Sequence, residues 1–338
     1  MSTASAPALP ARTTRRSAAP RLIPLALALL VLVLFFVRVL LGDYTVTFPD
    51  LVRILGGEQI PGASYIVREA KLPRALAAVL VGGGLGLAGA LMQDLLRNPL
   101  ASPDVLGISI GASAGAVVGS IVLGLGGYAV SLAALGGALG VALLVVLLAR
   151  GSTTRMVLVG VACASVLSAV IQWLLTRSDL NRAQAALAWL IGSLGDVTMR
   201  QVAMLAVALA ILTPLAAMIV PDLRAMRLGD DTAAGLGVPV RRRRAMVLLL
   251  VVLVVAACAS VAGPVVFVSL LAGPIARALS GRPAPFLAAG VGAALLLAAD
   301  FVAAELAPSP LPVGVVTGLA GGPFLLWLVL APHRKELR

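Results

Sequence analysis

Charged residues are scarce in this sequence. Only 12% of the 338 residues are Asp, Glu, Lys or Arg, whereas 60% are hydrophobic and the mean hydropathy is +1.07. A soluble domain of this length needs a polar, charged surface, which this composition cannot supply. The composition therefore excludes an ordinary water-soluble protein and predicts one that lies largely within a membrane.

Histidine and lysine are almost missing, and this excludes several enzyme classes. The single histidine, His333, cannot form the H-E-x-x-H motif of a metalloprotease. The only lysines, Lys71 and Lys335, lie outside any phosphate-cradling G-x-x-x-x-G-K-[ST] motif, so this chain is not expected to hydrolyse ATP by itself. We expect no enzymatic activity, no cofactor bound by this chain and no metal site.

Aromatic residues and cysteines are also rare. An aromatic content of 4%, with Gly, Ala, Leu and Val dominant, favours packed transmembrane helices over an outer-membrane barrel of alternating strands. Cys163 and Cys258 each lie inside an apolar stretch and are interpreted as small buried hydrophobic residues rather than a disulfide. The net charge of +12 comes from arginines between apolar stretches rather than on one element with stacking aromatics, so no nucleic-acid partner is expected.

Long apolar stretches dominate the chain. Each is close to the roughly 20 residues that a helix needs to cross about 30 Å of hydrocarbon. The seven clear stretches are residues 22–41, 75–92, 105–123, 128–149, 156–176, 202–220 and 245–263, and shorter ones cover 265–278, 286–304 and 311–331. The sequence therefore predicts an all-α polytopic membrane protein with about ten transmembrane helices. Glycines at four-residue spacing, as in Gly111, Gly115 and Gly119 and within 82–89, are expected to let these helices pack closely.

The basic residues predict the topology. Residues 1–21 form a basic tail that we expect to be disordered and cytoplasmic, and the apolar run after it is too long, and lacks a cleavage site, for a signal peptide. The membrane domain then covers 22–331, with a second cytoplasmic tail at 332–338. Alternation places the basic segments around Arg97, Arg150, 224–244 and Arg277 inside, and 177–200 outside with a short helix at 184–191.

A cytoplasmic turn follows the second apolar stretch. Asn98-Pro99 ends one helix, because the residue before proline disfavours the α region. Ser102 then caps the next helix, with Pro103 at its first position and Asp104 facing the positive helix end. Taken alone, this pattern predicts a tight, rigid turn.

Residues 222–244 form the longest polar link between confident spans. Small residues at a helix–Gly–helix junction are typical of a compact docking surface, whereas a plain solvated loop followed by four arginines explains the same spacing.

Asp300 is the one acid well inside a late apolar stretch. Such a carboxylate is a functional candidate, and the alternative is a structural Asp whose charge is satisfied near the outer helix end.

Several motifs, in order, resemble the FecCD family of permeases, which belong to ATP-dependent importers of ferric siderophores, vitamin B12 and haem. The resemblance covers the chain from the first span to the C-terminus. The motifs are Lys71-Leu72-Pro73-Arg74, Arg97-Asn98-Pro99-Leu100-Ala101, Leu106-Gly107 leading to Gly111-Ala112, Gly235-Leu236-Gly237, Ala262-Gly263-Pro264 and Leu311-Pro312-Val313-Gly314. The segments 229–233 and 311–317 look most like those of ferric-enterobactin permeases.

The resemblance implies a type II importer permease in a bacterial inner membrane, with both termini cytoplasmic. Its partners would be a second permease (identical or sister), two cytoplasmic ATPase subunits that use ATP, an extracytoplasmic siderophore-binding protein and the lipid bilayer. The expected cargo is a ferric siderophore, with vitamin B12 or haem as alternatives. An ion-coupled secondary transporter is a further alternative, although such carriers usually carry more intramembrane acids.

The resemblance also assigns roles to residues. The ATPase-coupling residues would be Asp230, Asp231, Ala233, Gly235, Leu236 and Gly237, and the binding-protein docking residues Lys71 and Arg74. The candidates for the translocation pathway or gate are Met92, Gln93, Asn98, Pro99 and Asp300. The family's Pro-His is replaced by Gly273-Pro274, its Glu before Leu-Pro by Pro310, and the basic residue that some members carry four positions after the aspartate by Ala304. The outer docking site is therefore expected to be weaker or differently shaped.

Overall fold

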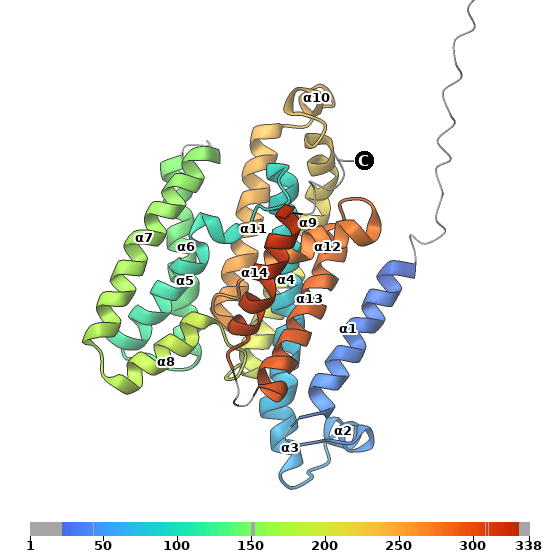
Figure 1. Ribbon diagram of the computed structural model, residues 1–338, viewed down its shortest axis with the longest axis vertical. Coiled ribbons are helices and arrows are strands. Elements are labelled where there is room, and N and C mark those ends of the chain that lie inside the picture. Colours follow the sequence, from blue (N-terminus) through green and yellow to red (C-terminus); the bar gives the residue numbers. More distant parts are fainter. Residues whose placement is uncertain (1–21, 43, 150–152, 308, 310, 331–338) are drawn as a thin grey trace, which may run out of the picture.

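The computed structural model describes residues 22–42, 44–149, 153–307, 309 and 311–330 (Figure 1). The two predicted tails, 1–21 and 332–338, lie outside these residues. The described residues are mainly helical and include no strand. Its helices are α1 (Leu22–Leu40), α2 (Phe48–Leu55), α3 (Ala63–Tyr65), α4 (Leu72–Leu96), α5 (Ile108–Val117), α6 (Tyr128–Ala149), α7 (Thr153–Arg177), α8 (Leu180–Ile191), α9 (Met199–Met226), α10 (Asp230–Gly235), α11 (Val240–Ala262), α12 (Val268–Ser280), α13 (Pro285–Phe301) and α14 (Val313–Leu330).

Four shorter helical pieces extend or join these helices. The π-helical turns η1 (Ile66–Lys71), η3 (Val118–Val122) and η4 (Val302–Leu306) continue into α4 or extend α5 and α13, and η2 (Pro103–Leu106) is a 3₁₀ turn. Within the described residues, seven helices are long and apolar enough to cross a membrane, and three shorter apolar helices lie at Ile108–Val122, Val268–Ser280 and Val313–Leu326. The prediction of an all-α bundle with about ten spans is confirmed.

The bundle has two distinct ends. Figure 1 shows α10 at one end, where α4 and α9 finish and α11 begins, and α2, α3 and α8 at the other. We call these the α10 end and the α8 end. The polar segments around Arg97, α10 and Arg282 all lie at the α10 end, as the alternating topology requires.

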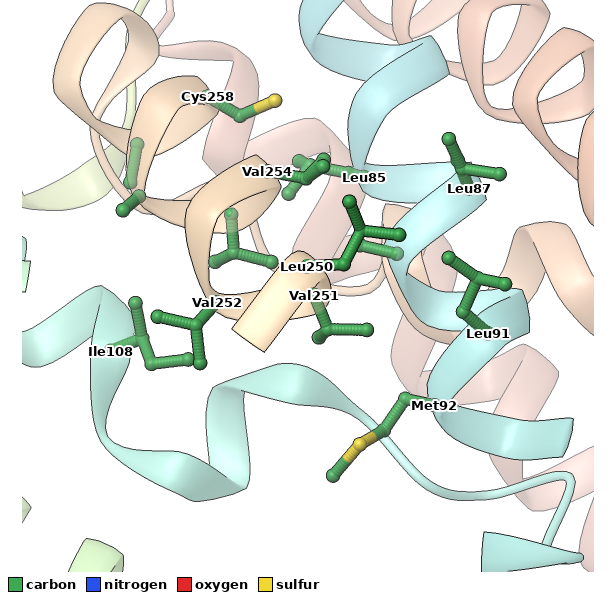
Figure 2. Packing of buried hydrophobic residues seen from close by; sticks show 14 of the residues in the cluster. Leu85, Leu87, Leu91, Met92, Ile108, Leu250, Val251, Val252, Val254 and Cys258 are labelled. Atoms are coloured by element: carbon green, nitrogen blue, oxygen red, sulfur yellow. The ribbon is translucent and has the colours of Figure 1, made fainter. Parts of the chain in front are cut away.

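Helix α4 is the central element of the bundle. In the span Ala63–Leu96, 78% of the apolar window is buried, compared with 11% for α1. Its neighbours α11, α12 and α13 pack directly against it. Figure 2 shows how this core is filled: Leu85 of α4 lies against Val254 of α11, and Ile108 of α5 lies near Val252.

Small residues allow this central packing. A Cβ atom at Gly89 would overlap the backbone carbonyl of Ser269 in α12, and one at Gly82 would overlap the carbonyl of Gly292 in α13. Gly115 of α5 lies in the same way against the carbonyl of Ala133 in α6. Because lipid supplies no hydrophobic force between helices, such close backbone contact supplies much of the association energy. The packing role predicted for these glycines is confirmed.

Some boundaries differ from the sequence-based prediction. Helix α4 ends at Leu96, before Asn98-Pro99, because Arg97 adopts the left-handed conformation with φ of 53°. The predicted 184–191 helix exists but begins earlier, at Leu180. Ser102 caps Pro103–Leu106 as predicted, although the capped element is a 3₁₀ turn that leads into α5.

We predict that Gly89→Leu destabilises the bundle, because its side chain has to displace the α12 backbone at Ser269. Overpacking of a tight core costs about 1–3 kcal/mol. Purified protein in detergent should lose its monodisperse size-exclusion peak at a lower temperature than wild type. Gly140→Leu on α6 is the matched control, because no atom lies within 4 Å of a Cβ at that position. Equal heat resistance of the two variants would contradict this role of Gly89.

Candidate functional site

Two side chains of helix α10, the carboxylate of Asp230 and the buried methyl group of Ala233, hold it against the bundle. Asp230, at its first position, accepts hydrogen bonds from Arg97 (Nη2–Oδ1, 2.7 Å) and Arg244 (Nη2–Oδ2, 2.7 Å). The hydrogen bond from Arg244, aided by the charge of Arg97, holds the pKa of Asp230 below its usual range. Ala233 is fully buried one turn further on. Asp230 thus ties α10 to both α4 and α11, and we call this arrangement the Asp230 latch.

The opposite face of α10 is open. Leu228 and Leu236, which flank the helix, are 68% and 65% exposed, and Asp231 is exposed between them. A Cβ at Gly235 would meet no atom within 4 Å, whereas Gly237 has φ of +83°, a conformation that favours glycine. Residues 222–244 therefore combine the end of α9, a connection containing α10, and the first turn of α11. The connection is a structured, partly apolar protrusion rather than a plain solvated loop.

A second ionic cluster lies towards the α8 end. Asp300 of α13 is fully buried and accepts hydrogen bonds from Arg38 (Nε–Oδ2, 2.7 Å) and Arg74 (Nε–Oδ1, 3.0 Å). Arg38 also lies 3.3 Å from Glu305. Two guanidinium groups therefore compensate the charge of Asp300. This arrangement favours the interpretation of Asp300 as a structural residue with satisfied charge over a functional carboxylate.

The predicted docking residues Lys71 and Arg74 have different environments. Lys71 is 7% exposed and its Nζ donates to the carbonyl oxygens of Leu41 (2.8 Å) and Tyr44 (2.6 Å). Arg74 keeps 18% of its side chain exposed while it pairs with Asp300. Neither side chain projects freely from the surface, so docking through these residues stays a prediction.

The predicted pathway residues also have intramolecular roles. Met92 and Gln93 are buried in the core. Figure 2 shows the Met92 side chain projecting from the last turns of α4 towards the connection to α5. Gln93 joins α4 to α12: it donates to the Leu270 carbonyl (3.0 Å) and accepts from Arg277 (2.9 Å). Gln93 therefore fixes the α4–α12 contact in this conformation.

Asn98 and Pro99 form the turn at the α10 end. The Asn98 side chain accepts a hydrogen bond from the backbone N–H of Leu100 at 2.9 Å, and both residues are exposed. This is the rigid turn that the sequence predicts. A role of these residues in the pathway or gate is not tested by the geometry and stays a prediction.

The partners Arg38, Arg97 and Arg244 were not among the predicted site residues. The signal for Arg38 is present in the sequence, because it is an arginine within the apolar stretch 22–41 and a charge at that depth needs an acid. No such signal exists for Arg97 and Arg244. Arg244 lies in the run of four arginines at 241–244, whereas Arg97 is the only arginine between Arg74 and Arg150, and sequence alone does not say that either of them meets Asp230.

A cavity of about 340 Å³ opens between α5, α6, α8 and α9 towards the α8 end. Its lining includes Trp189, the carboxylate residue Asp196 and the pair Ser131 and Gln201, whose side chains share a 2.8 Å hydrogen bond. This volume is near the lower end of the roughly 300–1,000 Å³ found for sites that hold drug-sized ligands.

Known proteins of similar sequence are transport proteins. The ferric enterobactin transport system permease protein FepG of Escherichia coli (strain K12) is 39% identical over 301 residues, covering 87% of this chain and 91% of that protein. The Fe(3+)-citrate import system permease protein YfmE of Bacillus subtilis (strain 168) is 35% identical over 337 residues, covering 96% and 99%. A vitamin B12 import system permease protein, BtuC of Salmonella typhi, is 33% identical over 319 residues, covering 92% and 95%.

The fold is also similar to that of a transport protein. A solved structure of a metal-chelate type ABC transporter in an inward-facing conformation superposes with a TM-score of 0.82 at 25% identity, covering 92% of this chain and 99% of that one. A model of the FecCD transport family matches residues 29–331. This match spans every long apolar helix apart from the first turns of α1, and it agrees with the order of motifs in the sequence. The chain therefore belongs to the FecCD transport family.

Proposed function

We propose that this chain is the transmembrane permease subunit of an ATP-binding-cassette importer that moves a ferric siderophore into the cytoplasm. The names of the relatives support an iron chelate as cargo, since the first two transport ferric enterobactin and ferric citrate. The structural relative, a metal-chelate type transporter, supports the same class. The observation that carries the proposal is the exposed α10 protrusion, held at its base by Asp230.

Helix α10 is proposed as the seat for a cytoplasmic ATPase subunit. Leu228 and Leu236 offer apolar contact area, and Gly235 leaves room for a partner to approach the backbone. Asp230 connects this surface to α4 and α11 by hydrogen bonds from two arginines. A displacement of α10 by the ATPase therefore acts on two membrane helices at once. The coupling roles of Asp231, Ala233 and Gly237 belong to the same proposal.

The topology follows from charge. Arginines concentrate at the α10 end, so this end faces the cytoplasm of a bacterial inner membrane and both termini lie there. The α8 end then faces the extracytoplasmic binding protein. Residues 1–21 and 332–338 are the proposed cytoplasmic tails.

The transport pathway is proposed to lie between two permease subunits. The 340 Å³ cavity at the α8 end is small for a bulky ferric chelate, and Met92, Gln93 and Asp300 are all engaged in packing or pairing. A pathway between this chain and a second, identical or sister, permease avoids opening the packed core around α4. Two ATPase subunits would then serve the pair, and ATP would be used by them.

Arg74 is proposed as the contact for the binding protein. Its guanidinium is partly exposed, and Asp300 keeps Arg38 as a second partner. A carboxylate of the binding protein can therefore take Arg74 without leaving Asp300 unpaired. Lys71 is enclosed by its carbonyl partners, so its contribution would be to hold the loop before α2 in place.

The cargo is tested by uptake of labelled iron. Iron-starved cells that lack this chain, or have it restored, would receive several ferric siderophores, with labelled vitamin B12 and haem in parallel. We expect loss and recovery of one ferric siderophore only. Selective loss of vitamin B12 uptake would support the alternative cargo suggested by the relative that is 33% identical. No change with any substrate would refute the importer and favour an ion-coupled carrier.

Substitution at Gly235 tests the ATPase seat. Gly235→Trp should insert and fold normally, because the position is open, but its bulk should block the partner and abolish transport-stimulated ATP hydrolysis in the reconstituted complex. Gly235→Ala is the matched control, since a methyl group there meets no atom and should leave coupling intact. Normal uptake and hydrolysis in Gly235→Trp would remove α10 from the interface.

Substitution at Arg74 tests the outer contact. Arg74→Gln leaves Asp300 paired with Arg38, so the fold should persist while affinity for the binding protein falls and depends less on salt. Binding would be measured in nanodiscs between low and physiological ionic strength. Arg53→Gln, which removes an exposed charge from α2, serves as control. An Arg74→Gln protein with wild-type affinity at low salt would show that docking does not use this residue.

A further inference from the structure

A groove at the α10 end includes Asp230 and Arg244 of the proposed ATPase seat, but its other lining residues have no role in the proposed transport mechanism. It has a volume of about 600 Å³ and lies between the ends of α6, α7 and α11. Its apolar lining includes Val146, Met156, Leu248 and Leu249, and its charged lining includes Arg241 and Arg244. We call it the α6–α11 groove. Figure 1 shows α6 and α7 beside α11, with the ends of these helices approaching the level of α10.

The groove is charged near the start of α11 and apolar further along this helix. Arg241 and Arg244 lie within the first two turns of α11, whereas Leu249 lies eight residues beyond Arg241, about 12 Å deeper at the rise of an α-helix. Val146 lies one turn before the end of α6 and is 48% exposed, and Leu249 is 56% exposed. In the proposed orientation, positive charge therefore lies at the level of lipid headgroups, and exposed apolar side chains lie at the level of acyl chains.

The charge balance of the groove is positive. Asp230 also lines it, but this carboxylate is shared by Arg97 and Arg244. Arg241 has no ion-pair partner among the described residues. The groove lining therefore carries two guanidinium groups and one carboxylate, and Arg97 outside the lining also compensates that carboxylate, so the excess charge is positive and attracts an anion.

The two features together define an amphipathic anion as the ligand. A small soluble anion would leave the apolar floor empty, and a neutral lipid would leave the charge of Arg241 uncompensated. Basic pockets between transmembrane helices on the cytoplasmic side are suited to anionic phospholipid headgroups.

We propose that the α6–α11 groove binds one anionic phospholipid of the cytoplasmic leaflet. Its phosphodiester lies between Arg241 and Arg244, and one acyl chain lies along Leu249 and Val146. This assignment rests on the orientation given under the proposed function, but not on the cargo or on ATPase docking. Because Arg244 also holds Asp230, the lipid lies next to the Asp230 latch and would stabilise the position of α10.

The proposal is tested by native mass spectrometry of the full chain in neutral detergent. The chain would be titrated with dioleoylphosphatidylglycerol, with dioleoylphosphatidylcholine, and with sn-glycerol 3-phosphate as a headgroup without chains. We expect one phosphatidylglycerol to be retained at a roughly thirtyfold lower concentration than phosphatidylcholine, as two arginine contacts imply. No retention of sn-glycerol 3-phosphate is expected, because it has no chain for the apolar floor.

Variants separate the groove from general surface charge. Arg241→Gln should remove most of the preference for phosphatidylglycerol, and Leu249→Trp should weaken its retention by filling the floor while leaving both arginines in place. Arg282→Gln, which removes an exposed charge at the same end of the bundle but outside the groove, should behave as wild type. All three positions are at the surface, so a normal size-exclusion profile is expected.

Two results would overturn the proposal. The first is equal retention of the two phospholipids by the wild-type chain. The second is an equal loss of preference in Arg241→Gln and Arg282→Gln, because this would show that net charge rather than the groove selects the lipid. Neither result would bear on iron uptake, so failure here is distinguishable from failure of the proposed transport function.

Discussion

The bundle depends on how closely other backbones approach α4. In lipid the hydrophobic effect does not drive helices together, so the attraction comes from close contact and from buried polar groups. Gly82 and Gly89 remove the side chains that would otherwise separate α4 from α13 and α12. Gln93, one turn beyond Gly89, then fixes the α12 contact by hydrogen bonds. The remaining spans pack around this centre.

Helix α4 also joins the two ionic clusters of the molecule. Arg74 near its start binds Asp300, and Arg97 at its end binds Asp230. These arginines are 23 positions apart, about 35 Å along an α-helix. Each aspartate holds a second arginine, Arg38 or Arg244, from another helix. One rigid helix therefore connects the proposed binding-protein face to the proposed ATPase seat, and any displacement of α10 has to be accommodated at Arg97.

The two clusters differ in how firmly they are held. Asp300 is fully buried, and loss of both of its arginine partners would leave an unpaired buried charge, which is costly. Asp230 is almost half exposed, so its ion pairs are screened and each contributes little to stability. This contrast suits their proposed roles. The buried Asp300 cluster keeps the helices together, whereas the ion pairs of the exposed Asp230 latch can break when a partner binds.

Much of this structure follows from the sequence. Hydropathy predicts the spans because the requirement to cross the hydrocarbon is local, and each stretch of about 20 apolar residues satisfies it alone. The Ser102 cap and the glycine spacing are local for the same reason. The ordered motifs indicate the family without any knowledge of the geometry, and the match across residues 29–331 agrees with them.

The partners of the charged residues were decided only by the tertiary structure. Asp300 meets Arg74 and Arg38 across 226 and 262 positions of sequence, and no local pattern specifies such a pair. The same limit applies to Lys71, whose sequence context suggests a surface charge but whose ammonium is enclosed by backbone carbonyls. The sequence by itself determined which segments enter the membrane and which end is basic. Only the packing of α4 against its neighbours determined which charges are buried and paired and which remain available to a ligand. The physical reason is that the free energy of burying and pairing a charge depends on groups brought together from distant parts of the chain.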